Sequence, residues 1–133
     1  MFGVKRHILI LRPKETDEFE RVLRSRFAVT VAKSLEELGG TELKDVDAAI
    51  LDISLPEKRG DVGGSRLKVS GAAVKAAQTL MESHTPFFAF GVGRLSNGEV
   101  ASLGGDYVQM NLDDPNTVSY KLWKLIEKRR QKV

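Results

Sequence analysis

The chain of 133 residues contains no cysteine and only four prolines, and no apolar run approaches the ~20 residues that a membrane-spanning helix requires. The absence of cysteine excludes disulfides, thiolate metal sites and cysteine nucleophiles, and it fits a cytoplasmic protein. An excess of one charge is also absent, because 21 basic and 18 acidic residues leave a net charge of only +3. That charge does not call for a nucleic-acid partner. We therefore expect a cytoplasmic protein that makes no membrane contact.

The composition is that of an ordinary globular domain. Hydrophobic residues make up 41% and charged residues 29% of the sequence, and a chain of this length buries one core without disulfides or metals. No internal repeat or linker interrupts it, so we expect a single domain over residues 1–133. The basic tail at 128–133 is either the end of the last helix or the beginning of a linker.

Short apolar segments that end at turn signals predict five strands. The segments are 7–11, 27–32, 47–53, 86–90 and 107–110. Helical spacing of apolar residues and capping residues predict five helices that alternate with the strands. The first helix is expected to begin after Thr16 or Asp17, and the second after Ser34. The third and fourth span 71–83 and 99–103, and the fifth begins near Pro115. The alternation predicts an α/β fold of three layers, a doubly wound five-stranded parallel sheet with the flavodoxin-like strand order 2-1-3-4-5.

One carboxylate stands at the end of a predicted buried strand. The segment 48–56, AAILDISLP, places Asp52 after a continuous apolar run and Pro56 four residues later. In open parallel sheets the ligand crevice lies at the carboxyl ends of the strands, and a proline fixes the turn that follows. Asp52 is therefore the candidate functional residue.

These residues resemble the receiver domain of two-component response regulators, a family of bacterial signalling proteins, over nearly the whole chain. The spacing of Asp52 and Pro56 carries the match, together with the strand 86–90 (PFFAF) and the segment 106–108 (DYV). The resemblance implies a phosphorelay in which a histidine kinase phosphorylates the strand-end aspartate. Asp52 is accordingly the phosphoacceptor candidate.

The other positions of the receiver pocket are changed. The resemblance implies an acidic pair that holds Mg²⁺ after the first strand, where this chain has Arg12 and Pro13. It also implies a small hydroxyl residue where this chain has Gly91 and a lysine where it has Met110. We therefore interpret the chain as a degenerate form, a pseudo-receiver, with no catalytic residue and no metal site.

The chemistry of Mg²⁺ explains why these changes matter. The ion takes octahedral oxygen ligands, usually one or two carboxylates with phosphate and water, whereas Asp52 with Arg12 offers one carboxylate and a repelling cation. Two interpretations of Arg12 remain open, an ion pair with Asp52 and a surface charge that follows the strand. The aromatic switch position of the family falls on Tyr107 or Val108, depending on a one-residue shift.

We predict a signal-transduction domain that is not an enzyme, carries no cofactor and acts mainly through protein–protein contacts. The resemblance implies a histidine kinase or an output domain or protein as the partner, and a contact face over residues 98–130. A homodimer through the last helix and the strand before it is compatible with that face. We interpret Trp123, in the last helix, as a packing residue.

Two alternatives remain. The chain could be a divergent receiver that is phosphorylated on Asp52, with Mg²⁺ held by Glu15, Asp17 or Glu57. It could also be a small anion- or nucleotide-binding module that uses the glycine loop 91–94 and the basic segment 58–68.

Overall fold

The computed structural model describes residues 5–13, 18–58, 69–91, 95–109 and 115–131. Five parallel strands form one sheet in the order β2-β1-β3-β4-β5, which confirms the predicted order 2-1-3-4-5. The strands are β1 (His7–Leu11), β2 (Ala28–Ala32), β3 (Ala48–Asp52), β4 (Phe87–Gly91) and β5 (Asp106–Gln109). The helices are α1 (Glu18–Arg26), α2 (Leu35–Gly39), α3 (Gly71–Glu82), α4 (Asn97–Leu103) and α5 (Pro115–Gln131).

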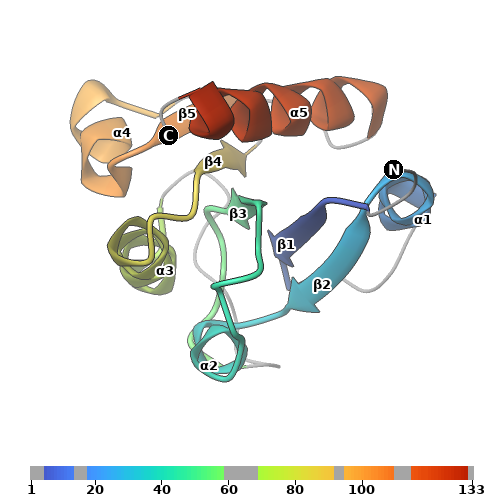
Figure 1. The fold of residues 1–133 in the computed structure, drawn as a ribbon. Coiled ribbons are helices and arrows are strands. Elements are labelled where there is room, and N and C mark those ends of the chain that lie inside the picture. Colours follow the sequence, from blue (N-terminus) through green and yellow to red (C-terminus); the bar gives the residue numbers. More distant parts are fainter. Residues whose placement is uncertain (1–4, 14–17, 59–68, 92–94, 110–114, 132–133) are drawn as a thin grey trace.

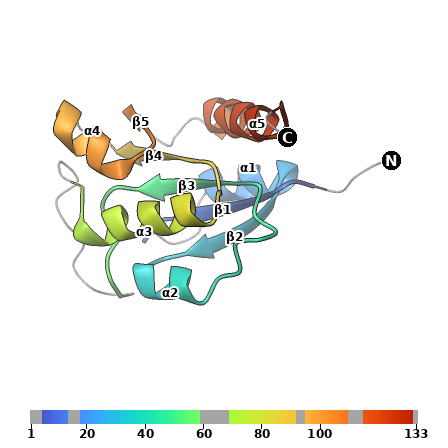
Figure 2. The same cartoon turned by 60° about the vertical axis from the view of Figure 1, so that its left-hand side comes forward.

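The helices cover both faces of the sheet and so make the three layers that the alternation predicts (Figure 1). Helices α2 and α3 lie on one face, and α1 and α5 lie on the other, as the turned view also shows (Figure 2). Among the residues that the structure describes, no helix is both long enough and apolar enough to cross a bilayer.

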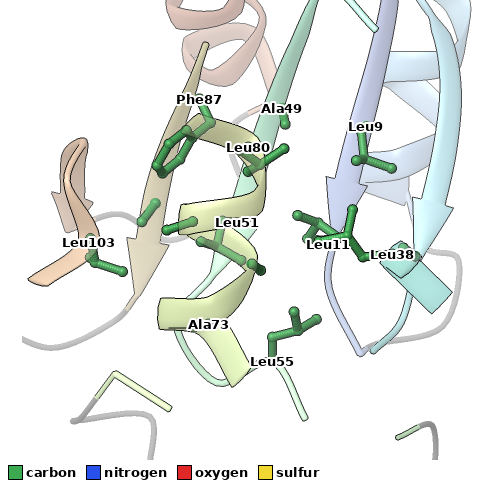
Figure 3. Close-up of a cluster of buried hydrophobic side chains, with 14 of the residues drawn as sticks. Leu9, Leu11, Leu38, Ala49, Leu51, Leu55, Ala73, Leu80, Phe87 and Leu103 are labelled. Atoms are coloured by element: carbon green, nitrogen blue, oxygen red, sulfur yellow. The ribbon is translucent and has the colours of Figure 1, made fainter. Parts of the chain in front are cut away.

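Two buried clusters follow from the alternation of side chains along the strands. Leu9, Leu11 and Leu51 point toward α2 and α3, where they pack with residues such as Leu38 and Leu80 (Figure 3). On the opposite face Ile8, Ile10, Ile50, Phe88 and Phe90 pack against Phe19 and Leu23 of α1 and against Val118, Leu122 and Ile126 of α5. Because β1, β3 and β4 are buried on both faces, their sequences are continuous apolar runs.

Local chemistry moves some of the predicted boundaries. Helix α4 begins at Asn97 rather than at residue 99, because Ser96 and Glu99 form a capping box in which each side chain accepts the other's backbone N–H at 3.2 Å. The box expected at Ser34 is half formed. The Ser34 hydroxyl accepts the Glu37 N–H at 3.1 Å, but the Glu37 carboxylate accepts the N–H of Lys33 at 3.2 Å.

Candidate functional site

The carboxyl edge of the sheet brings three of the predicted site residues onto neighbouring strands. Asp52 ends β3, Arg12 directly follows β1, and Gly91 ends β4. Leu11 pairs with Leu51 in parallel strands, so the next residues, Arg12 and Asp52, stand opposite each other at the ends of neighbouring strands. Side chains alternate along a strand, so both residues belong to the face that α1 and α5 cover. The structure therefore brings these three positions to one edge of the sheet.

The carboxylate of Asp52 is held by its own turn. Its Oδ1 atom accepts the backbone N–H of Ser54 at 2.8 Å and the Ser54 hydroxyl at 2.7 Å. The Leu55 N–H donates to the Asp52 carbonyl at 3.1 Å and closes the turn. Asp52 itself is half-buried. This Asx turn fixes the orientation of the carboxylate, and the Asp-x-Ser spacing is the sequence signal that would have revealed it.

The loop after Asp52 is anchored at both of its described ends. The carbonyl of Pro56 accepts the N–H of Leu35 at 2.9 Å, which joins the turn to the beginning of α2. Ser70, the N-cap of α3, donates its N–H to the Ile53 carbonyl at 2.8 Å and its hydroxyl to the Leu55 carbonyl at 2.7 Å. These bonds hold the segment after Asp52 in place from two helices. The sequence interpretation missed the role of Ser70.

Arg12 occupies neither of the two places that the sequence left open. Its side chain is buried, with 7% exposed, and the guanidinium carbon lies 5.3 Å from the centre of the Phe19 ring in α1. Its backbone N–H donates to the Ala32 carbonyl at 3.1 Å, which extends the pairing of β1 with β2 by one residue. Within the described ranges no ion pair joins Arg12 to Asp52, and the burial of Arg12 also argues against a surface charge. The guanidinium over the ring is a cation–π contact, which stabilises the side chain in this position.

The described residues at this edge do not supply the acidic pair that a magnesium ion of the receiver type would need. Arg12 and the exposed Pro13 stand where the acidic pair would be, which leaves Asp52 as the strand-end carboxylate. In the parts of the chain that the structure describes, no group of three or more His, Asp or Glu side chains could hold a metal ion. Glu57, five residues after Asp52, has a carboxylate oxygen 3.7 Å from the ammonium of Lys75 in α3. Glu15 and Asp17 lie outside the described residues.

Gly91 makes room for the hydroxyl of Tyr107. A Cβ atom at position 91 would lie 2.8 Å from the Tyr107 Oη and 2.6 Å from Cδ1 of Ile53, both closer than such contacts allow. The phenol of Tyr107 therefore lies in the space that a side chain on residue 91 would need. Burial raises the pKa of Tyr107 above its ordinary value of 10.0, and the charges of Asp52 and Glu99 raise it further.

Tyr107 and Val108, between which the sequence left the aromatic position open, lie on opposite faces of the sheet. Tyr107 packs with the cluster under α3, on the side of Gly91, whereas Val108 packs with the cluster of α1 and α5. The aromatic position next to the strand-end site is thus Tyr107. Met110, the loop residues 92–94 and the basic segment 59–68 lie outside the described residues.

Removing the Asp52 carboxylate should cost little stability. Asp52→Ala removes the acceptor of both Ser54 bonds and should lower the free energy of unfolding by about 1–2 kcal/mol, measured by urea denaturation. Asp52→Asn keeps an Oδ1 acceptor and should lose less than half of that amount. Equal losses in the two variants would mean that the charge, and not the Ser54 turn, stabilises this edge.

A cavity among the described residues lies away from Asp52. It has a volume of about 480 Å³ and opens at the amino ends of β4 and β5, between Met81, Phe87, Gly105 and Leu125. Asp52 stands at the opposite edge of the sheet. Near Asp52 the described residues place one oriented carboxylate at the edge of the sheet.

Comparisons with known proteins agree with this fold. No protein-family model matches the sequence, and no curated protein matches it. A solved structure described as a two-component system response regulator/GGDEF domain protein is 19% identical, with a TM-score of 0.57. That match covers 92% of this chain and 46% of the other, so this chain spans less than half of that protein's length.

Two further solved structures match along most of both chains. The N-terminal domain of a response regulator receiver protein from Methanoculleus marisnigri JR1 is 18% identical, with a TM-score of 0.51 and 95% and 96% of the two chains covered. A fusion that carries the yeast Spc42 trimeric coiled coil is 15% identical, with a TM-score of 0.64 and 99% and 85% covered. The chain has the receiver-like α/β fold.

Proposed function

We propose that the chain is a receiver-like signal-transduction domain with a degenerate phosphorylation pocket, and that it acts through protein–protein contacts. The observation that carries the proposal is the buried Arg12, whose guanidinium lies on Phe19 where the family resemblance implies a metal-binding carboxylate. Phosphoryl transfer depends on positioned positive charge around the phosphoryl oxygens, supplied by Mg²⁺ and lysine in this family. Arg12 points its charge at α1 instead.

Gly91 and Tyr107 support the same proposal. Gly91 carries no hydroxyl, and the space beside it is filled by the phenol of Tyr107. A phosphoryl group on Asp52 would therefore meet neither the metal nor the hydroxyl through which such a domain senses it. We propose that the domain is not an enzyme, needs no cofactor and holds one conformation. Its partner would be a bacterial cytoplasmic protein, a histidine kinase or an output protein, bound over α4, β5 and α5.

One observation favours the alternative of a phosphorylatable receiver. Asp52 is half-buried rather than enclosed, and Ser54 binds only its Oδ1 atom in the hydrogen bonds that the structure describes. A phosphodonor could therefore reach the carboxylate. The two proposals differ in whether the other residues at this edge of the sheet support phosphoryl transfer to the Asp52 carboxylate.

Small acyl phosphates with Mg²⁺ should therefore leave the protein unmodified. We expect no phosphoryl incorporation in the intact mass spectrum, because one carboxylate without metal ligands does not position the donor. The matched control is Asp52→Asn under the same conditions. Incorporation that requires Mg²⁺ and disappears in Asp52→Asn would show a working receiver and contradict the degenerate pocket.

A further inference from the structure

Strand β2 forms one edge of the sheet, and its outer side is not paired with another strand. The strand order places β2 at one end of the sheet and β5 at the other, and no strand lies beyond β2 (Figure 1). The Ala28 N–H and the Ala32 carbonyl bond to backbone groups at the two ends of β1, at 2.9 and 3.1 Å. The backbone groups of successive residues in a strand point to opposite sides, so those of Val29 and Val31 point away from β1.

Most of these outward backbone groups have no protein partner. The Val29 carbonyl accepts a hydrogen bond from the Arg24 side chain at 3.3 Å. Among the described residues, nothing bonds to the Val29 N–H or to the N–H and carbonyl of Val31. An unpaired strand edge is a template for pairing with another chain, and proteins usually block it with a charged side chain or a proline. The sequence of β2, AVTVA, contains neither.

The sequence of β2 also reads the same in both directions, with Thr30 in the middle. A second copy can therefore lie antiparallel with Thr30 opposite Thr30, so that each valine faces a valine and each alanine faces an alanine. Val29 and Val31 then form the hydrogen-bonded pairs of the ladder, in which every outward N–H meets an outward carbonyl of the other copy. The pairing displaces the Arg24 hydrogen bond, which at 3.3 Å is long. An edge that complements itself favours a second copy over an unrelated extended segment.

Side chains on both faces of the sheet suit the same arrangement. Val29 and Val31 are half-buried at the border of the cluster beneath α1 and α5, and the valines of a second copy would cover them further. On the other face the Thr30 hydroxyl lies 2.7 Å from Nε2 of His7, and the two Thr30 side chains would lie side by side at the axis. Cross-strand pairs of this kind stabilise antiparallel ladders.

We propose that two copies of this chain pair edge to edge through β2, antiparallel about a twofold axis at Thr30, so that their two five-stranded sheets become one continuous sheet. The proposal goes beyond the proposed function, because β2 lies at the opposite end of the sheet from β5 and from the contact face over α4, β5 and α5. Neither Asp52 nor α5 takes part in the pairing.

Single cysteines test the register, because the chain has no cysteine of its own. Thr30→Cys places two thiols at the axis, where the Cα atoms of facing residues are ~4.5 Å apart and a disulfide can form. Ala28→Cys is the matched control on the same strand and face, since its two copies would lie four residues or ~13 Å apart. Under mild oxidation we expect Thr30→Cys to form a covalent dimer at least tenfold faster than Ala28→Cys, measured by non-reducing electrophoresis. Position 28 is the more exposed, so accessibility alone predicts the opposite order.

Sedimentation equilibrium over a concentration series measures the pairing without a cross-link. We expect a monomer–dimer equilibrium, with a dissociation constant that Val31→Pro raises by roughly tenfold or more, because the outward N–H is lost while pairing with β1 needs no N–H from this residue. Thr30→Lys should weaken the dimer similarly, since it places like charges at the axis. Ser102→Lys, on the exposed side of α4, adds the same charge and should leave association unchanged. Circular dichroism checks that each variant is folded.

Several results would overturn the proposal. A wild-type protein that is monomeric at every concentration would do so, and equal cross-linking of Thr30→Cys and Ala28→Cys would rule out the register. A dimer that tolerates both Val31→Pro and Thr30→Lys would place the interface elsewhere. Binding of an extended peptide from another protein along β2, without self-association, would also contradict the proposal. The degenerate pocket is tested separately by the phosphodonor experiment, whose result does not depend on β2.

Discussion

Aspartate in place of Arg12 should destabilise the domain by about 3 kcal/mol, measured by urea denaturation. Arg12 and Phe19 are 7% and 5% exposed and lie 5.3 Å apart, so the shorter side chain uncovers the ring. The substitution also places a carboxylate beside the negative ring face and next to Asp52 on the neighbouring strand, and an unpaired buried charge is costly. Arg12→Lys keeps the charge but loses the planar stacking, and it should lose an intermediate amount.

The same variant tests the assignment of the pocket. Arg12→Asp would add a second carboxylate beside Asp52 and remove the repelling cation, so millimolar Mg²⁺ should recover part of the lost stability in this variant. The melting temperature of the wild-type protein should not respond. Lys44→Asp, on the exposed surface, is the charge-matched control. If Mg²⁺ raised the wild-type melting temperature through Asp52, the edge would already hold the metal and the degenerate pocket would be wrong.

Threonine at position 91 should cost about 2–3 kcal/mol. Its Cβ would meet Ile53 at 2.6 Å and the Tyr107 hydroxyl at 2.8 Å, and overpacking of a buried site carries a cost of that size. Gly71→Thr is the control, because a Cβ at Gly71 meets nothing within 4 Å. Chemical denaturation measures both. A neutral Gly91→Thr would mean that Tyr107 does not occupy this space in solution.

The titration of Tyr107 gives a second test of whether threonine at position 91 displaces the phenol of Tyr107. Burial, then the charges of Asp52 and Glu99, raise the pKa of Tyr107 above 10.0 in the folded protein, and Gly91→Thr should move it back toward that value. Tyr107 and Tyr120 are the two tyrosines of the chain, so a Tyr120→Phe background isolates the signal in the ultraviolet. Because the pKa of Tyr107 is raised in the folded state, the protonated phenol contributes to the stability of the fold. That contribution is complete below pH 10.0 and is lost as the pH rises through the folded-state pKa.

Much of the fold was predictable from the residues because its signals are local. The apolar runs around Ile10, Ile50 and Phe88 are buried on both faces of a parallel sheet, and turn residues separate them. The exceptions are boundaries that depend on neighbours in space. Phe27, which the alternation placed in a strand, precedes β2 and packs against Trp123 of the last helix. Gly91, which lies outside the predicted segment 86–90, belongs to β4 because it pairs with Gln109.

The candidate site, like the fold, could be predicted from the sequence only in part. The sequence by itself determined that Asp52, Arg12 and Gly91 stand at one edge, because strand ends in a parallel sheet meet there. Only the tertiary structure decided which groups touch. Arg12 lies on Phe19 rather than on Asp52, and the Tyr107 hydroxyl lies beside Gly91. Long side chains near the end of a strand pack against the side chains of neighbouring helices and strands. Those neighbours are far away in the sequence, so spacing along the chain does not encode them.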